Sequence, residues 1–143
     1  MSVKVKFEGL DEVLEAIDSI DDINDLYKAM NKACAFVERT AKQKAPKGRT
    51  GELRNSITSK VERDGNEIVG IVFTPLHYAP YREFGTGLFA ENGGRKDVPW
   101  RYEDEQGEWH TTSGMRPHPF MRPALYENQN KIKELLKEGI KKQ

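Results

Sequence analysis

Small and apolar side chains recur every three or four residues between Asp22 and Ala45, which is the spacing of one face of an α-helix. The set is Leu26, Met30, Ala33, Cys34, Val37 and Ala41. Pro46 and Gly48 follow the last of them, and proline cannot continue the interior of a helix. The pattern predicts one long core helix that ends near Ala45.

Shorter, alternating patterns predict strands on both sides of this helix. Val3, Val5 and Phe7 alternate with lysines, which is the period-two pattern of a half-buried strand. Two β-rich runs between Ile57 and Phe73 flank an Asp-Gly pair, a common signal of a hairpin turn. We therefore expect a short first strand and a later β-hairpin.

Two further stretches have helical spacing. Residues 10–20 place apolar side chains on one face and acids at the N-terminal end, where the helix dipole favours them. Residues 123–140 carry a second apolar stripe after a proline-stiffened entry, and Pro123 suits the first turn of a helix. Both stretches are predicted to be amphipathic helices.

Residues 88–114 interrupt this regular order. Residues 88–97 are rich in turn formers and are expected to form a mobile loop, whereas Val98–Trp109 alternates like a second hairpin. The order of elements predicts a single α+β domain over residues 1–143. We expect a mainly antiparallel sheet packed against one long helix, with an extended loop and hairpin and a C-terminal helix.

Charge is balanced overall but unevenly placed. Lysine plus arginine and aspartate plus glutamate each number 23, so the chain lacks the net positive charge of a dedicated nucleic-acid binder. Acids dominate residues 1–26 and bases dominate residues 27–66. The bases at the end of the long helix and in the turn after it are Lys42, Lys44, Lys47, Arg49 and Arg54. A nucleic-acid-binding module that uses this basic turn, residues 42–54, is the alternative function.

Cys34 is the only cysteine, so an intramolecular disulfide and a thiolate metal cage are excluded. Its place on the apolar stripe predicts a buried thiol with a raised pKa rather than a nucleophile. No apolar stretch reaches the ~18 residues of a membrane span, and the start of the chain lacks the apolar run of a signal peptide. We expect a cytosolic protein without a membrane partner.

Candidate catalytic chemistry is sparse. His77, His110 and His118 form no His-x3-His or His-x-His pair, so a metal site built from them and Glu83 is a remote alternative. The acids at 103–105 are expected at a hairpin turn, as a solvated acidic tip rather than an acid-base pair. No nucleophile elbow or phosphate-binding loop occurs. The sequence therefore assigns no catalytic residue, no metal ligand and no cofactor.

The segment His77–Gly87, HYAPYREFGTG, concentrates the residue types that anchor protein interfaces. Its candidate contact residues are Tyr78, Tyr81, Arg82, Glu83, Phe84 and Gly85. The glycines, including Gly87, permit tight turns. A competing interpretation is that Tyr78 and Phe84 complete the core at the edge of a strand.

Three short motifs follow one another in a fixed order. Thr-Gly-x-Leu-Arg-x-Ser is Thr50–Ser56, Tyr-Ala-x-Tyr-x-Glu-Phe-Gly-Thr is Tyr78–Thr86, and Pro-Phe-Met-x-Pro-Ala is Pro119–Ala124. In this order they resemble the neck or tail-completion proteins of long-tailed bacteriophages and prophages, a family typified by a "gene product ten". The resemblance covers about residues 25–140.

The resemblance implies a non-enzymatic structural protein that assembles as a ring at the junction of phage head and tail, as a neck or tail-terminator component. The implied partners are further copies in a ring such as a hexamer, head-closure or connector proteins, and tail-tube or terminator proteins, with passing contact to DNA in the channel. The implied location is the virion, and before assembly the cytoplasm of the bacterial host.

A ring of identical subunits needs contacts between unlike faces, and the separated acidic and basic parts of the chain are suited to supply them. Beside the His77–Gly87 segment, the predicted interface residues are Lys44, Arg49, Arg54 and Phe120. The predicted structural turns are at Thr50, Gly51, Gly87, Pro119 and Pro123.

Overall fold

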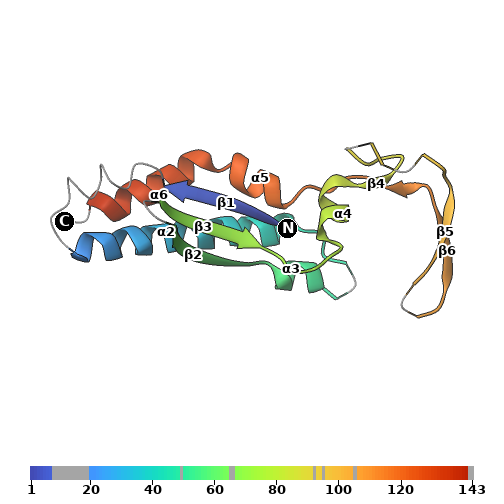
Figure 1. Ribbon diagram of the computed structural model, residues 1–143, viewed down its shortest axis with the longest axis horizontal. Coiled ribbons are helices and arrows are strands. Elements are labelled where there is room, and N and C mark those ends of the chain that lie inside the picture. The colour runs from blue at the N-terminus through green and yellow to red at the C-terminus, as the bar shows by residue number, and fades with distance from the viewer. Residues whose placement is uncertain are drawn as a thin grey trace. The chain divides into compact units, whose positions relative to one another are not determined.

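The fold is known from a computed structural model of the 143-residue chain (Figure 1). It describes residues 1–7, 20–48, 50–64, 67–91, 93–94, 96–104 and 106–141. The chain divides into two compact units. The first unit contains Met1–Pro75 and Phe120–Gln143, and the second unit is Leu76–Pro119.

The first unit contains a three-stranded antiparallel sheet in the order β1-β3-β2. The strands are β1 (Ser2–Phe7), β2 (Thr58–Asp64) and β3 (Glu67–Phe73). In the central strand, Val72 pairs with Val3 of β1 and Gly70 pairs with Val61 of β2. The predicted first strand and the predicted hairpin are both confirmed.

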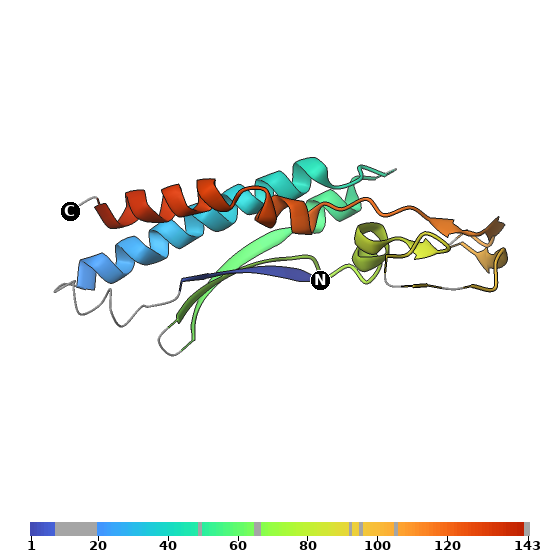
Figure 2. The same ribbon diagram turned by 90° about the horizontal axis from the view of Figure 1, so that it is seen from above.

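The helix α2 (Ile20–Lys44) covers one face of this sheet together with the two C-terminal helices (Figures 1 and 2). The apolar stripe that predicted the helix is buried, and each member is at most 2% exposed. Together with Ile57, which follows α3, and the strand side chains Ile68 and Val72 it forms the core. The prediction of an antiparallel sheet against one long helix, and with it the α+β class, is confirmed.

Gly70 allows α2 to lie close to the central strand. A Cβ atom at this position would lie 2.1 Å from Cys34 Sγ and 3.0 Å from Met30 Sδ, so no larger residue fits without displacement. The sequence analysis did not identify this glycine, because nothing local in the strand pattern indicates which residue the helix will approach.

The C-terminal segment forms two helices where one was predicted: α5 (Met121–Tyr126) and α6 (Gln129–Lys141). The break follows from Asn128, whose side-chain Nδ2 donates to the carbonyl of Ala124 at 3.0 Å while its own carbonyl accepts from Ile132 N at 3.0 Å. A second difference is the short helix α3 (Glu52–Ser56), in a segment that we expected to be a polar turn. The helix predicted at residues 10–20 lies almost entirely outside the described residues.

The second unit contains four short strands and one short helix, α4 (Ala79–Phe84). The strands are β4 (Thr86–Gly87), β5 (Trp100–Glu103), β6 (Trp109–Thr112) and β7 (Gly114–Met115). Antiparallel pairs form between β4 and β7 and between β5 and β6, so the predicted second hairpin is present. Tyr78 and Phe84 flank or end a helix, so the alternative of a strand edge was wrong.

Candidate interaction surface

The His77–Gly87 segment forms α4 and the glycine turn that ends it. A proline lies in the first turn of α4, and Gly85 N donates to the carbonyl of Tyr81 at 3.0 Å to close the last turn. Gly85 has a φ of +81°, and a Cβ there would lie 2.8 Å from the carbonyl oxygen of Met115. His118 N donates to the carbonyl of Arg82 at 2.7 Å. The segment is thereby fixed to the strand and loop at residues 113–118.

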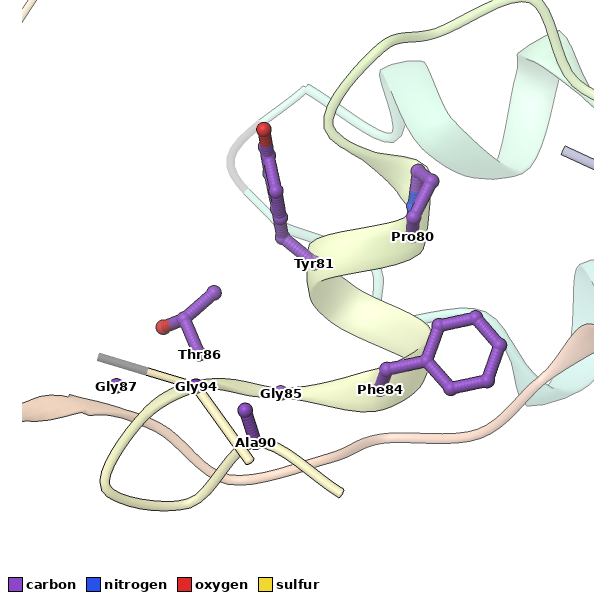
Figure 3. Close-up of a pocket in the computed structure, with 8 residues that line it drawn as sticks. All are labelled: Pro80, Tyr81, Phe84, Gly85, Thr86, Gly87, Ala90 and Gly94. Atoms are coloured by element: carbon purple, nitrogen blue, oxygen red, sulfur yellow. The ribbon is translucent and has the colours of Figure 1, made fainter. Parts of the chain in front are cut away.

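The candidate contact residues of this segment differ in exposure. Tyr81 is 55% exposed, whereas Tyr78, Arg82 and Phe84 are half-buried. Glu83 is fully buried, so it supports the segment from within rather than touching a partner. A small hollow of about 280 Å³ lies over the turn, with Pro80, Tyr81 and Phe84 of α4 on its rim and glycines along the turn (Figure 3).

A larger open groove of about 860 Å³ lies between α4 and the second hairpin. Its walls carry Tyr78, Tyr81, Arg82, Thr86, Trp100, Tyr102, Thr112 and Met115. Arg82 is the one charged residue among those that line the groove, and its Nη1 lies 3.3 Å from Sδ of Met115. The groove is lined by large rings with few polar groups, which is the character of a protein contact surface.

The turn of the β5–β6 hairpin is organised by Asp104. Its Oδ1 accepts hydrogen bonds from the backbone N–H groups of Gln106 at 2.9 Å and Glu108 at 2.8 Å. Its Oδ2 lies 2.7 Å from His110 Nε2. The hydrogen bond with His110, followed by the bond from the Glu108 amide, holds the pKa of the Asp104 carboxyl below its ordinary value. The predicted acidic hairpin turn is confirmed, and its central carboxylate is a structural group.

The two faces of the hairpin carry aromatic side chains. On one face the Tyr102 ring stacks on His110 with centroids 5.3 Å apart, and on the other the Arg101 guanidinium lies 5.2 Å from the Trp109 ring centre. Trp109 is nevertheless 58% exposed and Tyr102 45% exposed. Tryptophan and tyrosine are the residue types most enriched at interface hot spots. The sequence analysis missed both as contact residues, although an aromatic on each face of a two-stranded hairpin was a visible signal.

A remote alternative was a metal site made from the three histidines and Glu83. These four residues are all described, yet the group of potential ligands that the described chain brings together is Asp104, Glu108 and His110, with their ligand atoms within 4.8 Å. Both oxygens of Asp104 already bind the hairpin turn. The contacts within this group therefore have a structural explanation.

The basic turn is largely held by internal contacts. Lys44 Nζ lies 3.0 Å from a carboxylate oxygen of Glu127, and Arg54 Nη2 donates to the carbonyl of Ala45 at 3.2 Å. Lys42 pairs at 3.8 Å with Glu38 of the preceding helical turn. Arg49 lies outside the described residues. These pairs reduce the positive potential that a phosphate backbone would meet.

The remaining predicted positions are divided between the two units. Gly51 precedes α3 with a φ of +68°, and Thr50 Oγ1 accepts from Glu52 N at 3.3 Å. Phe120 is fully buried, and Pro123 lies in the first turn of α5. Pro119 is exposed and Gly87 has a φ of +62°.

Cys34 is buried on the core stripe, as predicted. Desolvation raises the pKa of its thiol to about 11, and the nearby charge of Glu38 adds to the rise. A thiol with this pKa is almost entirely protonated at neutral pH and is a poor nucleophile.

Fold and surface together define a small α+β protein whose second unit presents an exposed aromatic hairpin. Residues 10–85, more than half of the chain, match the model of the HK97-gp10-like family, described as "Bacteriophage HK97-gp10, putative tail-component". The chain belongs to this family, and the phage family indicated by the three motifs is thereby confirmed. No curated protein and no solved structure gives a significant match. Among the described helices, none has the length and apolar character needed to cross a membrane.

Proposed function

We propose that this phage tail component acts at the junction of head and tail, as a neck or tail-completion (terminator) protein that assembles into a ring. The observation that carries the proposal is the exposure of Tyr81, Tyr102 and Trp109 on one small unit, at 45% to 58% each. Exposed aromatic side chains of this size are characteristic of surfaces that other proteins cover. The proposed role is structural, without a catalytic residue or a cofactor.

The construction of the second unit supports a role in contacts. Within the described residues, β5 and β6 pair only with each other, and a two-stranded hairpin is marginally stable alone in water. Among the described residues of this unit, Ala79, Glu83, Gly85 and Gly87 are buried, and they supply very little apolar core. A partner that covers the aromatic faces would stabilise the hairpin as well as gain affinity.

The proposed partners are further copies of the chain, a head-closure or connector protein, and a tail-tube protein, all within the virion. In this assembly Tyr78, Tyr81, Arg82 and Phe84 contribute contacts, while Glu83 and Gly85 support them. Three other candidate residues support the interface indirectly, because each already makes contacts or is buried within the first unit: Lys44, Arg54 and Phe120.

The test is light scattering after size exclusion over a wide concentration range, alone and with the purified tail-tube and connector proteins of the same phage. We expect a species with the mass of a closed ring, in at least one of these conditions, and annular particles by negative-stain microscopy. A constant monomer in every condition contradicts the proposal. If that monomer also binds duplex DNA with an affinity that falls steeply with salt, the nucleic-acid alternative replaces it.

A further inference from the structure

Three exposed bases lie on the solvent face of α2. Lys28, Lys32 and Arg39 are exposed and are separated by four and seven residues, which places them on one face of the helix. We call these three residues the basic stripe. The exposed residues between and beside them, such as Asn31, Ala35 and Gln43, are neutral.

The charges of the basic stripe are not neutralised by the rest of the described chain. Two acids on the same helix have described side chains, Asp25 and Glu38, and both are half-buried; Asp25 lies on the same side of the helix as Lys28. Glu38 pairs with Lys42 rather than with a member of the stripe. Within the described residues, no ion pair or hydrogen bond engages the side chain of Lys28, Lys32 or Arg39. This contrasts with the basic turn, whose lysines and arginine are largely engaged.

The end of the β5–β6 hairpin carries the opposite charge. Glu103 and Glu108 are exposed, and with Asp104 they form a group that we call the acidic tip. His110 contacts Asp104 at 2.7 Å, and Arg101 lies over the Trp109 ring, whereas Glu103 and Glu108 are the exposed acids of the tip. The hydrogen bonds of Asp104 fix the turn in advance, so that little conformational entropy remains to be lost when the tip binds.

We propose that the hairpin of one copy docks on the α2 face of a second copy, with the acidic tip against the basic stripe. This inference rests on the proposed ring and names the two surfaces that build it. The two surfaces are unlike, so each copy offers one of each and the contact repeats from copy to copy, as a ring requires. Trp109 then packs on the aliphatic stems of the lysines, which such long side chains leave available.

The basic stripe and the strands of the hairpin are similar in length. From Lys28 to Arg39 the stripe spans about 16 Å at 1.5 Å per helical residue. Each four-residue strand of the hairpin spans about 13 Å at roughly 3.3 Å per residue. A second copy is favoured over DNA as the occupant, because the chain has zero net charge and itself supplies the exposed acidic tip. The same hairpin also carries the exposed aromatic residues that need a partner.

Charge reversal tests the contact in both directions. The tip variant carries Glu103→Lys and Glu108→Lys, and the stripe variant carries Lys28→Glu and Lys32→Glu. Each variant alone should assemble at least about a hundredfold more weakly, because like charges then face each other across the interface. An equal mixture of the two should assemble again, since each reversed surface finds its complement on the other variant.

The matched control is Lys131→Glu with Lys133→Glu, which makes the same change in net charge on exposed residues of α6. It should assemble like the parent protein. Circular dichroism and thermal midpoints of all variants establish that the monomers are folded. A cysteine pair gives an independent readout: Lys32→Cys mixed with Glu108→Cys should form a disulfide-linked dimer under oxidation, whereas Lys131→Cys mixed with Glu108→Cys should not.

The outcomes separate this inference from the proposed function. If the parent protein forms rings and both reversal variants do so equally well, the docking contact is wrong and the ring proposal stands. If the stripe variant keeps assembling but loses salt-sensitive binding of duplex DNA that the parent protein shows, the stripe contacts phosphates instead. If the parent protein forms no assembly alone or with its partners, the proposed function fails and this contact fails with it.

Discussion

The two units of this protein are stabilised in different ways. The first unit buries a continuous apolar stripe of α2 against a sheet, and its largest core side chains are less than 2% exposed. The second unit is organised by polar turns and close backbone contacts, such as the Asp104 network and the approach of Gly85 to Met115. Its largest side chains lie at the surface. In this protein, the unit that folds around an apolar core and the unit that exposes a tryptophan are distinct.

The largest effect is expected on stability, from removal of a buried aromatic side chain in the first unit. Phe120→Ala deletes a fully buried side chain and leaves a cavity, so the free energy of unfolding should fall by about 3–5 kcal/mol. Urea titration followed by circular dichroism measures the change. Phe120→Leu, which retains most of the volume, is the control and should cost less than about 1.5 kcal/mol. If the alanine variant keeps parental stability but fails to assemble, Phe120 is a contact residue after all.

The difference between the units also explains what the sequence could predict. The stripe from Leu26 to Ala41 has a clear helical period, and the alternating strands have a clear period of two, so the first unit followed from local patterns. The close approach at Gly70 did not, because it depends on which helix residue meets that strand position. The break at Asn128 was also missed, because one side-chain hydrogen bond decides it.

In the second unit, short elements weakened the sequence signal. The helix α4 has only six residues and contains a proline, so its apolar period is too short to recognise. The motif itself was recognised as an interface candidate, and the structure places Tyr81 on the surface as such a role requires. Trp109 was missed because its exposure depends on what covers the hairpin, and within the described residues β5 and β6 pair only with each other.

Removal of an aromatic side chain from the second unit should weaken assembly and leave stability nearly unchanged, the opposite of the effect expected at Phe120. Trp109→Ala should change the stability of the isolated protein by less than about 1 kcal/mol, because the side chain is 58% exposed and loses chiefly its contact with Arg101. Assembly should weaken strongly, as measured by light scattering. Tyr126→Ala is the matched control, since Tyr126 is 63% exposed in the first unit. Equal loss of assembly in both variants would mean that exposure alone does not identify the contact.

The smallest effect concerns the stability of the hairpin as a function of pH. It should change with the titration of Asp104 in the second unit, whereas the apolar core of the first unit should not respond. Hydrogen bonds with His110 and with backbone amides hold the pKa of the Asp104 carboxyl below its ordinary value. The stabilisation from the carboxylate is therefore fully present above the unfolded pKa of about 3.9, and it is lost as the pH falls through the lower folded value.

We expect the chemical shift of the Trp109 indole N–H to move toward the value of a disordered chain below about pH 4, in a window set by the lowered pKa of Asp104. In Asp104→Asn the charge-assisted contact to His110 is absent at every pH, so the same signal should be displaced already at neutral pH and should lack this transition. Core methyl signals, such as those of Val37, serve as the internal reference for the first unit. If the Trp109 transition persists unchanged in Asp104→Asn, another group controls the hairpin, and the turn is not organised by this carboxylate.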